Sequence, residues 1–151
     1  MFLYYARAVN HTILVALNII SVEQANSTET TTKAFTQLLN YSVMYSEAIT
    51  RYYANHMILH IHGNASFLSE PGAKSIAGGC HFLRTASVVP NKSLIKQPPP
   101  NGPVHVKFTT IRNVLYSTME AELGALFVNC QIGADTCMAL IKMGHAYPSA
   151  P

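Results

Sequence analysis

Two pairs of residues in this chain have side chain types and a spacing that could do chemistry. Glu120 and Glu122 place two carboxylates in the first turn of an expected helix, where the helix dipole favours negative charge. His60 and His62 have the His-x-His spacing that puts two imidazoles on one face of a strand, as a metal site needs. Both glutamates could also serve only the helix end, and the histidines lack an evident third ligand.

The glutamates depend on a helix that is predicted to start at Ser117. Ser117 can cap the first turn, and Glu120 lies three residues on, where a capping box has its acidic residue. Two sets of residues recur beyond it at helical spacing: Leu123, Phe127 and Cys130, and Glu122, Leu126 and Asn129. Past Gly133 we expect a separate short helical segment over 136–142, which ends at Gly144.

The histidines depend on strands that are predicted upstream of this helix. Alternation over Met57–His62 brings His60, His62 and Asn64 to one face and leaves Leu59 and Ile61 on the other. Further strands are expected over 49–54, 76–85 and 104–110, with a turn at Phe67–Ala73. The pair Gly78-Gly79 indicates a place where the backbone passes close to a neighbouring group.

The first 47 residues are predicted to be helical. Apolar residues recur at three- and four-residue steps over 2–22, and a second helix is expected over about 29–45, after the polar link 26–32. The two helices would form a hairpin. The fold class is therefore α/β of the α+β kind, with a helix hairpin followed by antiparallel strands and one helix packed on the sheet.

The order of motifs resembles one family. Ile58–Phe67 with its Asn64-Ala65-Ser66 turn, Ala77–Leu83 with its Gly-Gly, and Ser117-Thr118-Met119-Glu120-Ala121-Glu122-Leu123 together resemble the ribonuclease H domain of copia-type retrotransposon polyproteins. The resemblance implies that 1–47 are the helical tail of the reverse transcriptase, with Leu38–Tyr41 as its connecting motif. It also implies that 48–151 are a truncated ribonuclease H-like domain.

The resemblance implies two site residues, and both are vestigial. Ribonuclease H hydrolyses the RNA of an RNA–DNA hybrid with two Mg²⁺ ions held by clustered acids. The first-strand acid position falls on Asn64 and the helix position on Glu122. The later Asp positions have no counterpart, because the chain ends before them and its single Asp is Asp135. Asn64 is neutral, so we expect no stable two-metal site, no cofactor and no enzymatic activity.

Composition limits the other function classes. The 151 residues suit one domain or one domain with an appendage, with 49% hydrophobic and 11% charged residues and a net charge of +3. The charge permits a nucleic-acid partner without arguing for one. Cys80, Cys130 and Cys137 form no pairable framework, which favours a reducing, intracellular compartment and buried free thiols. The apolar run Thr12–Ile20 is too short to cross a membrane, so no membrane partner is expected.

The sequence therefore predicts an inactive remnant of a copia-type reverse transcriptase and ribonuclease H. Its partners would be an RNA–DNA hybrid, by resemblance, and the missing polymerase and downstream ribonuclease H segments. Two alternatives stay open: a ribonuclease H completed by a missing downstream segment, and a non-catalytic module that binds partners through a free sheet edge. The prolines of Pro90–Pro103 are interpreted as a stiff connector in each case. An open sheet edge and exposed apolar helices predict poor solubility or oligomerisation.

Overall fold

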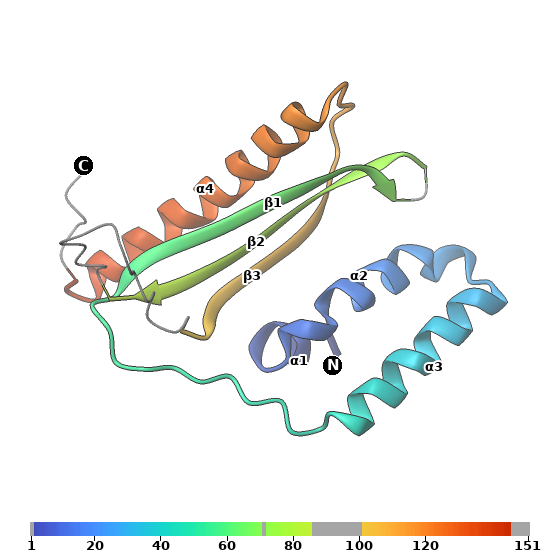
Figure 1. The fold of residues 1–151 in the computed structure, drawn as a ribbon, viewed down its shortest axis with the longest axis horizontal. Coiled ribbons are helices and arrows are strands. Elements are labelled where there is room, and N and C mark those ends of the chain that lie inside the picture. The colour runs from blue at the N-terminus through green and yellow to red at the C-terminus, as the bar shows by residue number, and fades with distance from the viewer. Residues whose placement is uncertain (1, 71, 86–100, 146–151) are drawn as a thin grey trace, which may run out of the picture. The chain divides into compact units, whose positions relative to one another are not determined.

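A computed structural model describes residues 2–70, 72–85 and 101–145, and the chain divides into two units, Met1–Thr50 and Arg51–Pro151 (Figure 1). This division lies close to the boundary expected at residue 47. Most of the expected proline-rich connector, up to residue 100, lies outside the described residues, as does the tail after His145.

The first unit contains three α-helices: α1 (Phe2–Ala8), α2 (Leu14–Val22) and α3 (Glu29–Met44). The single helix expected over 2–22 is wrong, because the chain leaves the helical conformation at Asn10, with φ −117° and ψ 86°. The Asn10 side chain accepts a hydrogen bond from the Thr12 backbone N–H at 3.2 Å. A short polar side chain that bonds the backbone just ahead of it starts a new helix instead of continuing the old one.

The helix expected over about 29–45 is confirmed as α3. Its cap is reciprocal, because the Thr31 backbone N–H donates to Thr28 Oγ1 at 3.4 Å and the Thr28 backbone N–H donates to Thr31 Oγ1 at 3.2 Å. Helices α2 and α3 contact each other and leave an apolar groove of about 510 Å³, lined by residues such as Ile20, Leu38 and Tyr41. The hairpin therefore keeps a hydrophobic surface of its own.

The second unit contains a three-stranded antiparallel sheet in the order β1-β2-β3, made of β1 (Ile58–Glu70), β2 (Lys74–Arg84) and β3 (Pro103–Ile111). These confirm the strands expected near 57–62, 76–85 and 104–110. Strand β1 runs further than expected, and the turn comes after Glu70 instead of over the whole of 67–73. The pairing of β1 with β2 is regular from Ile58 to Ser66 and irregular between Ser66 and Glu70.

The strand expected over 49–54 is wrong. The backbone of Arg51–Tyr53 instead bonds to the residues that precede β3. Tyr53 donates its N–H to Asn101 Oδ1 at 2.7 Å and accepts from Asn101 Nδ2 at 3.1 Å, and Arg51 O accepts from Gly102 N–H at 2.8 Å. A side chain amide presents a donor and an acceptor much as a peptide group does, so Asn101 takes the place of a neighbouring strand.

Helix α4 (Thr118–Lys142) begins where the sequence predicts. The Glu120 backbone N–H donates to Ser117 Oγ at 3.2 Å, while Glu120 Oε2 accepts from the Tyr116 backbone N–H at 2.7 Å. The separate segment expected over 136–142 is wrong, because α4 continues through Gly133. This glycine is a contact position and not a helix end: an added Cβ would lie 2.6 Å from Ile61 Cδ1.

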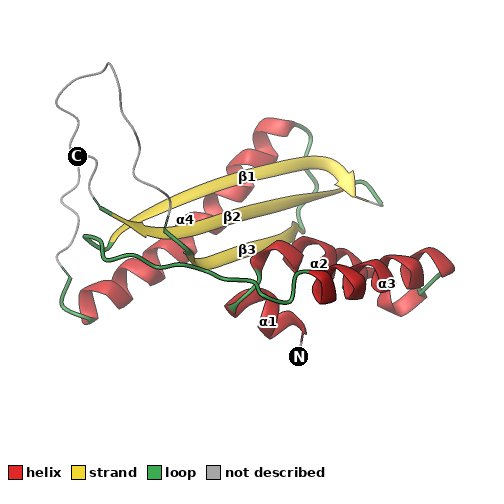
Figure 2. Ribbon diagram, turned by 60° about the horizontal axis from the view of Figure 1, so that its bottom comes forward, coloured by secondary structure: helices red, strands yellow, loops and turns green. Residues whose placement is uncertain are grey.

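Helix α4 covers one face of the sheet, mainly over β1 and β2 (Figures 1 and 2). Most of its buried residues are small and recur at four-residue spacing, with one amide among them: Ala121, Ala125, Asn129 and Gly133; Leu140 near its end is buried as well. Of the two recurring sets in the sequence, only Asn129 belongs to this face, since Leu123, Leu126 and Phe127 are each more than half exposed. Small side chains allow the helix to approach the sheet closely, and the larger ones then point outward.

We expect Gly79→Ala to lower the free energy of unfolding by about 1–3 kcal/mol, because its Cβ would overlap Asn129 Oδ1 on α4. Gly78→Ala is the matched control. It makes the same change in the unfolded chain, but the atom nearest to its Cβ is Asn64 O at 3.8 Å. Urea unfolding of both variants measures the difference, and equal stabilities would contradict this packing.

Candidate functional site

A groove of about 370 Å³ lies between β1 and α4 in the second unit. Its strand side is formed by Ile61 and Gly63, and its helix side includes Glu122, Leu126 and Cys130. These residues share the groove because β1 is the outermost strand of the sheet while α4 runs over β1 and β2. The groove is mainly apolar, with one carboxylate, and is therefore suited to binding an apolar segment.

Asn129 holds α4 over Gly63 on β1 and Gly79 on β2. It is 1% exposed, and its Nδ2 donates to Gly78 O at 3.0 Å and to Ala125 O at 2.9 Å. A Cβ at Gly63 would lie 2.9 Å from Asn129 Nδ2. Asn129 Oδ1 is buried without a hydrogen-bond partner. An amide in this position links helix to sheet, and only glycine leaves room for it on both strands.

The two glutamates have separate roles in the structure. The Glu120 carboxylate accepts a hydrogen bond from the Tyr116 backbone N–H and so stabilises the start of the helix, which is the purely structural role considered for it above. Glu122 is exposed and lines the groove beside Ile61 and Gly63. Of the two, Glu122 is therefore the carboxylate that a molecule in the groove could reach.

Asn64 is not brought together with Glu122. Gly63 and Gly79 face Asn129 on α4, and side chains alternate along a regularly paired strand, so Asn64 points to the opposite face of the sheet. No hydrogen bond or ion pair joins Asn64 to Glu122 in the described parts of the chain. The two vestigial positions of the resemblance thus lie on different sides of β1.

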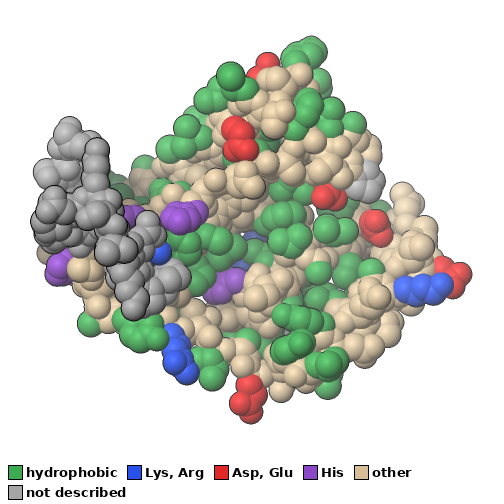
Figure 3. Space-filling view, viewed as in Figure 1, with side chains coloured by type: hydrophobic (Ala, Val, Ile, Leu, Met, Phe, Trp, Pro, Cys, Tyr) green, Lys and Arg blue, Asp and Glu red, His purple; other side chains and the backbone are tan. Residues whose placement is uncertain are grey.

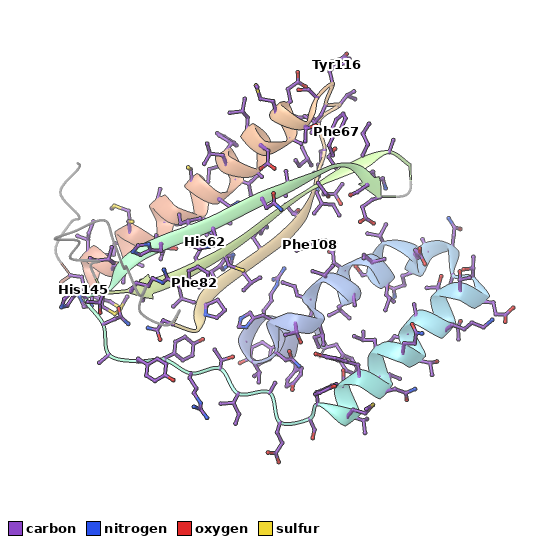
Figure 4. The ribbon with its side chains drawn as sticks, viewed as in Figure 1. His62, Phe67, Phe82, Phe108, Tyr116 and His145 are labelled. Carbon is purple, nitrogen blue, oxygen red and sulfur yellow. The ribbon has the colours of Figure 1, made fainter. Side chains whose placement is uncertain are left out.

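His60 and His62 share that opposite face with Phe82 and Arg84. The His62 and Phe82 rings meet edge to face, with centroids 5.1 Å apart, and the Arg84 guanidinium carbon lies 5.8 Å from the Phe82 centroid (Figure 4). Over 2–70, 72–85 and 101–145, no group of three His, Cys, Asp or Glu side chains could hold a metal ion. The arrangement is an aromatic and cationic cluster.

Sequence reasoning did not single out His81, which lies under α4. It is fully buried, its Nε2 lies 3.4 Å from Asn129 O, and its Nδ1 has no hydrogen-bond partner. Its ring stacks edge to face with that of His105 on β3, with centroids 5.5 Å apart. The strand alternation places His81 with Ile61 and Gly79 on the helix side. The alternation of the strand could therefore have grouped His81 with these residues. Alternation alone does not show which face a helix covers, so it could not predict that His81 is buried.

All three cysteines are free thiols, but they are not all buried as expected. Cys130 is exposed in the groove, while Cys80 and Cys137 are partly buried. Burial raises the pKa of the Cys80 thiol, so it remains protonated and unreactive at neutral pH. Cys130 is therefore the thiol that reagents reach most readily.

Among the described residues, α4 is the one helix long and apolar enough to cross a membrane by length and composition. The expectation from the sequence concerned only Thr12–Ile20 as a membrane-crossing segment and did not include the longer helix α4. Figure 3 shows hydrophobic side chains along the outer side of α4. The opposite side packs against the sheet, and a single helix that is long and apolar enough is weak evidence for a membrane role.

Comparison with models of protein families, with curated proteins and with solved structures finds no match.

We expect the stability of the chain to fall as the pH drops below the ordinary histidine pKa of 6.5. Burial, then the charge of Arg84, then His62 lower the pKa of His60. A histidine whose pKa is lower in the folded state binds fewer protons when folded. Its contribution is therefore present above pH 6.5 and is lost as the pH falls through the folded pKa.

The measurement is the unfolding free energy of wild type and His60→Gln between neutral and mildly acidic pH. His60→Gln should flatten the acid limb, and His56→Gln, the same substitution at an exposed residue before β1, is the control. An unchanged acid limb in His60→Gln would show that other groups control the loss.

Proposed function

We propose that this chain is a non-catalytic remnant of a copia-type reverse transcriptase and ribonuclease H. The observation that carries the proposal is the order of elements around the motif Ser117–Leu123. The motif starts a helix that packs on an antiparallel sheet, and the first strand of that sheet carries Asn64 in an Asn-Ala-Ser sequence. The resemblance implies this order, although no match to a solved structure identifies the fold as that of ribonuclease H.

The lack of catalysis is proposed from the chemistry of the two positions. Two-metal hydrolysis requires several carboxylates that share two cations. Asn64 supplies a neutral amide on one side of β1, and Glu122 supplies a carboxylate on the other. Asp135, the single Asp of the chain, lies two residues past Gly133, far along α4 from Glu122. Among the described residues, Glu122 is therefore the one carboxylate that lines the groove, and no second carboxylate lies beside it to share a metal ion.

A second candidate function is a non-catalytic interaction module. The free edge of β1 and the apolar groove beside it favour this alternative, since an extended segment could add to the sheet there. A ribonuclease H completed by a downstream segment would use the same edge for a strand that brings further acids. Activity on a hybrid separates these possibilities.

We expect no cleavage of an RNA–DNA hybrid by wild type or by Asn64→Asp in Mg²⁺ or Mn²⁺. Restoring the first-strand acid yields two carboxylates on opposite sides of a strand, which cannot share a pair of metal ions. Loss of metal ligands removes both activation of the water and stabilisation of the leaving oxygen, together worth many powers of ten in rate. The assay follows a labelled hybrid on a denaturing gel.

Glu122→Gln and the double variant Asn64→Asp/Glu122→Gln are the controls for metal-dependent cleavage. Cleavage by wild type that disappears in Glu122→Gln would refute the proposal, because it would reveal a working site that includes this carboxylate. Cleavage gained by Asn64→Asp and lost in the double variant would show that the substitution at 64 alone had silenced the site.

A further inference from the structure

Among the residues that the structure describes, strand β1 pairs with β2 on one side only, and the regular part of its other edge, Ile58–Ser66, contains neither charged residues nor proline. It is one of the two edge strands of the sheet, and the stretch from Ile58 to Ser69 contains no Lys, Arg, Asp, Glu or Pro. Edge strands of soluble proteins are normally protected by such residues. The pairing of Ile58–Ser66 with β2 has no register shift, so this part of the strand could pair along its whole length on the other side as well.

The groove beside this edge has apolar residues of α4 on its helix side. Met119, Leu123 and Leu126 line it, and they are 74%, 58% and 58% exposed. A strand added to β1 would therefore leave these side chains uncovered unless it also brought an apolar element of its own. An isolated peptide strand does not meet that requirement, whereas a strand that carries its own helix does.

We propose that the partner is a second copy of this chain, whose β1 pairs antiparallel with β1 so that two sheets become one and two α4 helices pack side by side. A twofold axis perpendicular to the sheet generates both contacts at once, with both helices on the same face. This inference rests on the edge and groove alone and does not depend on the proposed function.

The spacing of the elements supports this partner. Asn129 reaches both Gly63 and Gly79, so α4 lies over the seam between β1 and β2. Adjacent strands are about 4.8 Å apart, so the two seams of the joined sheet lie about 10 Å apart. Packed helices have axes about 8–10 Å apart. Pairing of the strands therefore brings the helices to contact distance without rearrangement of either copy.

The charges are compatible with the same arrangement. Pairing of Ile58–Ser66 with itself puts the axis near His62 and Gly63, and Gly63 lies against Asn129 and shares the groove with Cys130. The helices then run antiparallel, so that their dipoles oppose favourably. Glu122 and its copy lie on opposite sides of the axis, about 20 Å apart along the helices. Among the described residues, those nearest the axis are the two copies of His62 and Gly63, and no two carboxylates meet there.

We expect the full chain to be a dimer at micromolar concentration by sedimentation velocity. Leu126→Lys should weaken the dimer by about tenfold or more, because it puts a charge between the helices. Met138→Lys is the matched control: Met138 is 54% exposed against 58% for Leu126, and it lies about 120° away around the helix. Circular dichroism checks that both variants fold.

Cross-linking gives a readout that needs no destabilising variant. Cys130 lies next to the axis in this arrangement, so mild oxidation should join two copies through it. Cys137 lies about 10 Å further along the helix, and its copy is then too far away for a disulfide. Cys130→Ser should abolish the link and Cys137→Ser should preserve it. A monomer at micromolar concentration, equal effects of the two Lys variants, or a link that needs Cys137 would each overturn the proposal.

Discussion

The close approach of α4 to the sheet is the constraint on which the rest of the second unit depends. A large side chain at Gly63, Gly79 or Gly133 would collide with Asn129 or Ile61, so these three positions favour glycine. Because the helix presents Ala121, Ala125 and Gly133 to the sheet, most of its larger apolar residues point away from this core, and Leu140 near its end is the large one that is buried. The small residues of α4 bury little apolar area against the sheet, so the hydrogen bonds of Asn129 matter more to the stability of this unit. Loss of a hydrogen bond to a buried amide destabilises a fold by about 1–3 kcal/mol.

Local signals in the sequence were sufficient for the elements whose ends are set by their own residues. Helix α3 begins at a reciprocal threonine cap, and α4 begins at Ser117, so both starts could be predicted. The strand pair β1 and β2 follows from alternation and from the glycines between them. Expectations failed where a distant group decides the outcome. Asn101 satisfies the backbone at Tyr53, and Ile61 occupies the space that Gly133 leaves within a continuing helix.

The candidate site could be predicted only in part, for the same reason. Periodicity placed Glu122 on a helix and Asn64 on a strand, and both placements hold. It did not determine which face of β1 meets the helix, since a period of two fits either choice. That choice depends on the fit of Asn129 over Gly63 and Gly79, and it separates Asn64 from Glu122. Exposure of Cys130 likewise depends on the small-residue face that α4 uses.

The two edges of the sheet differ, and this difference governs how far assembly could proceed. At the Pro103 end of β3, Arg51 and Tyr52 bond to Gly102 and Pro103, and the strand itself contains Pro103 and Lys107. Proline and lysine both oppose the addition of a strand. A sheet that can grow at one edge only is complete after a single round of pairing. The same chain with two open edges could extend into a ribbon, whereas in the proposed dimer the bonds of Arg51 and Tyr52, together with Pro103 and Lys107, would oppose further strand addition at β3.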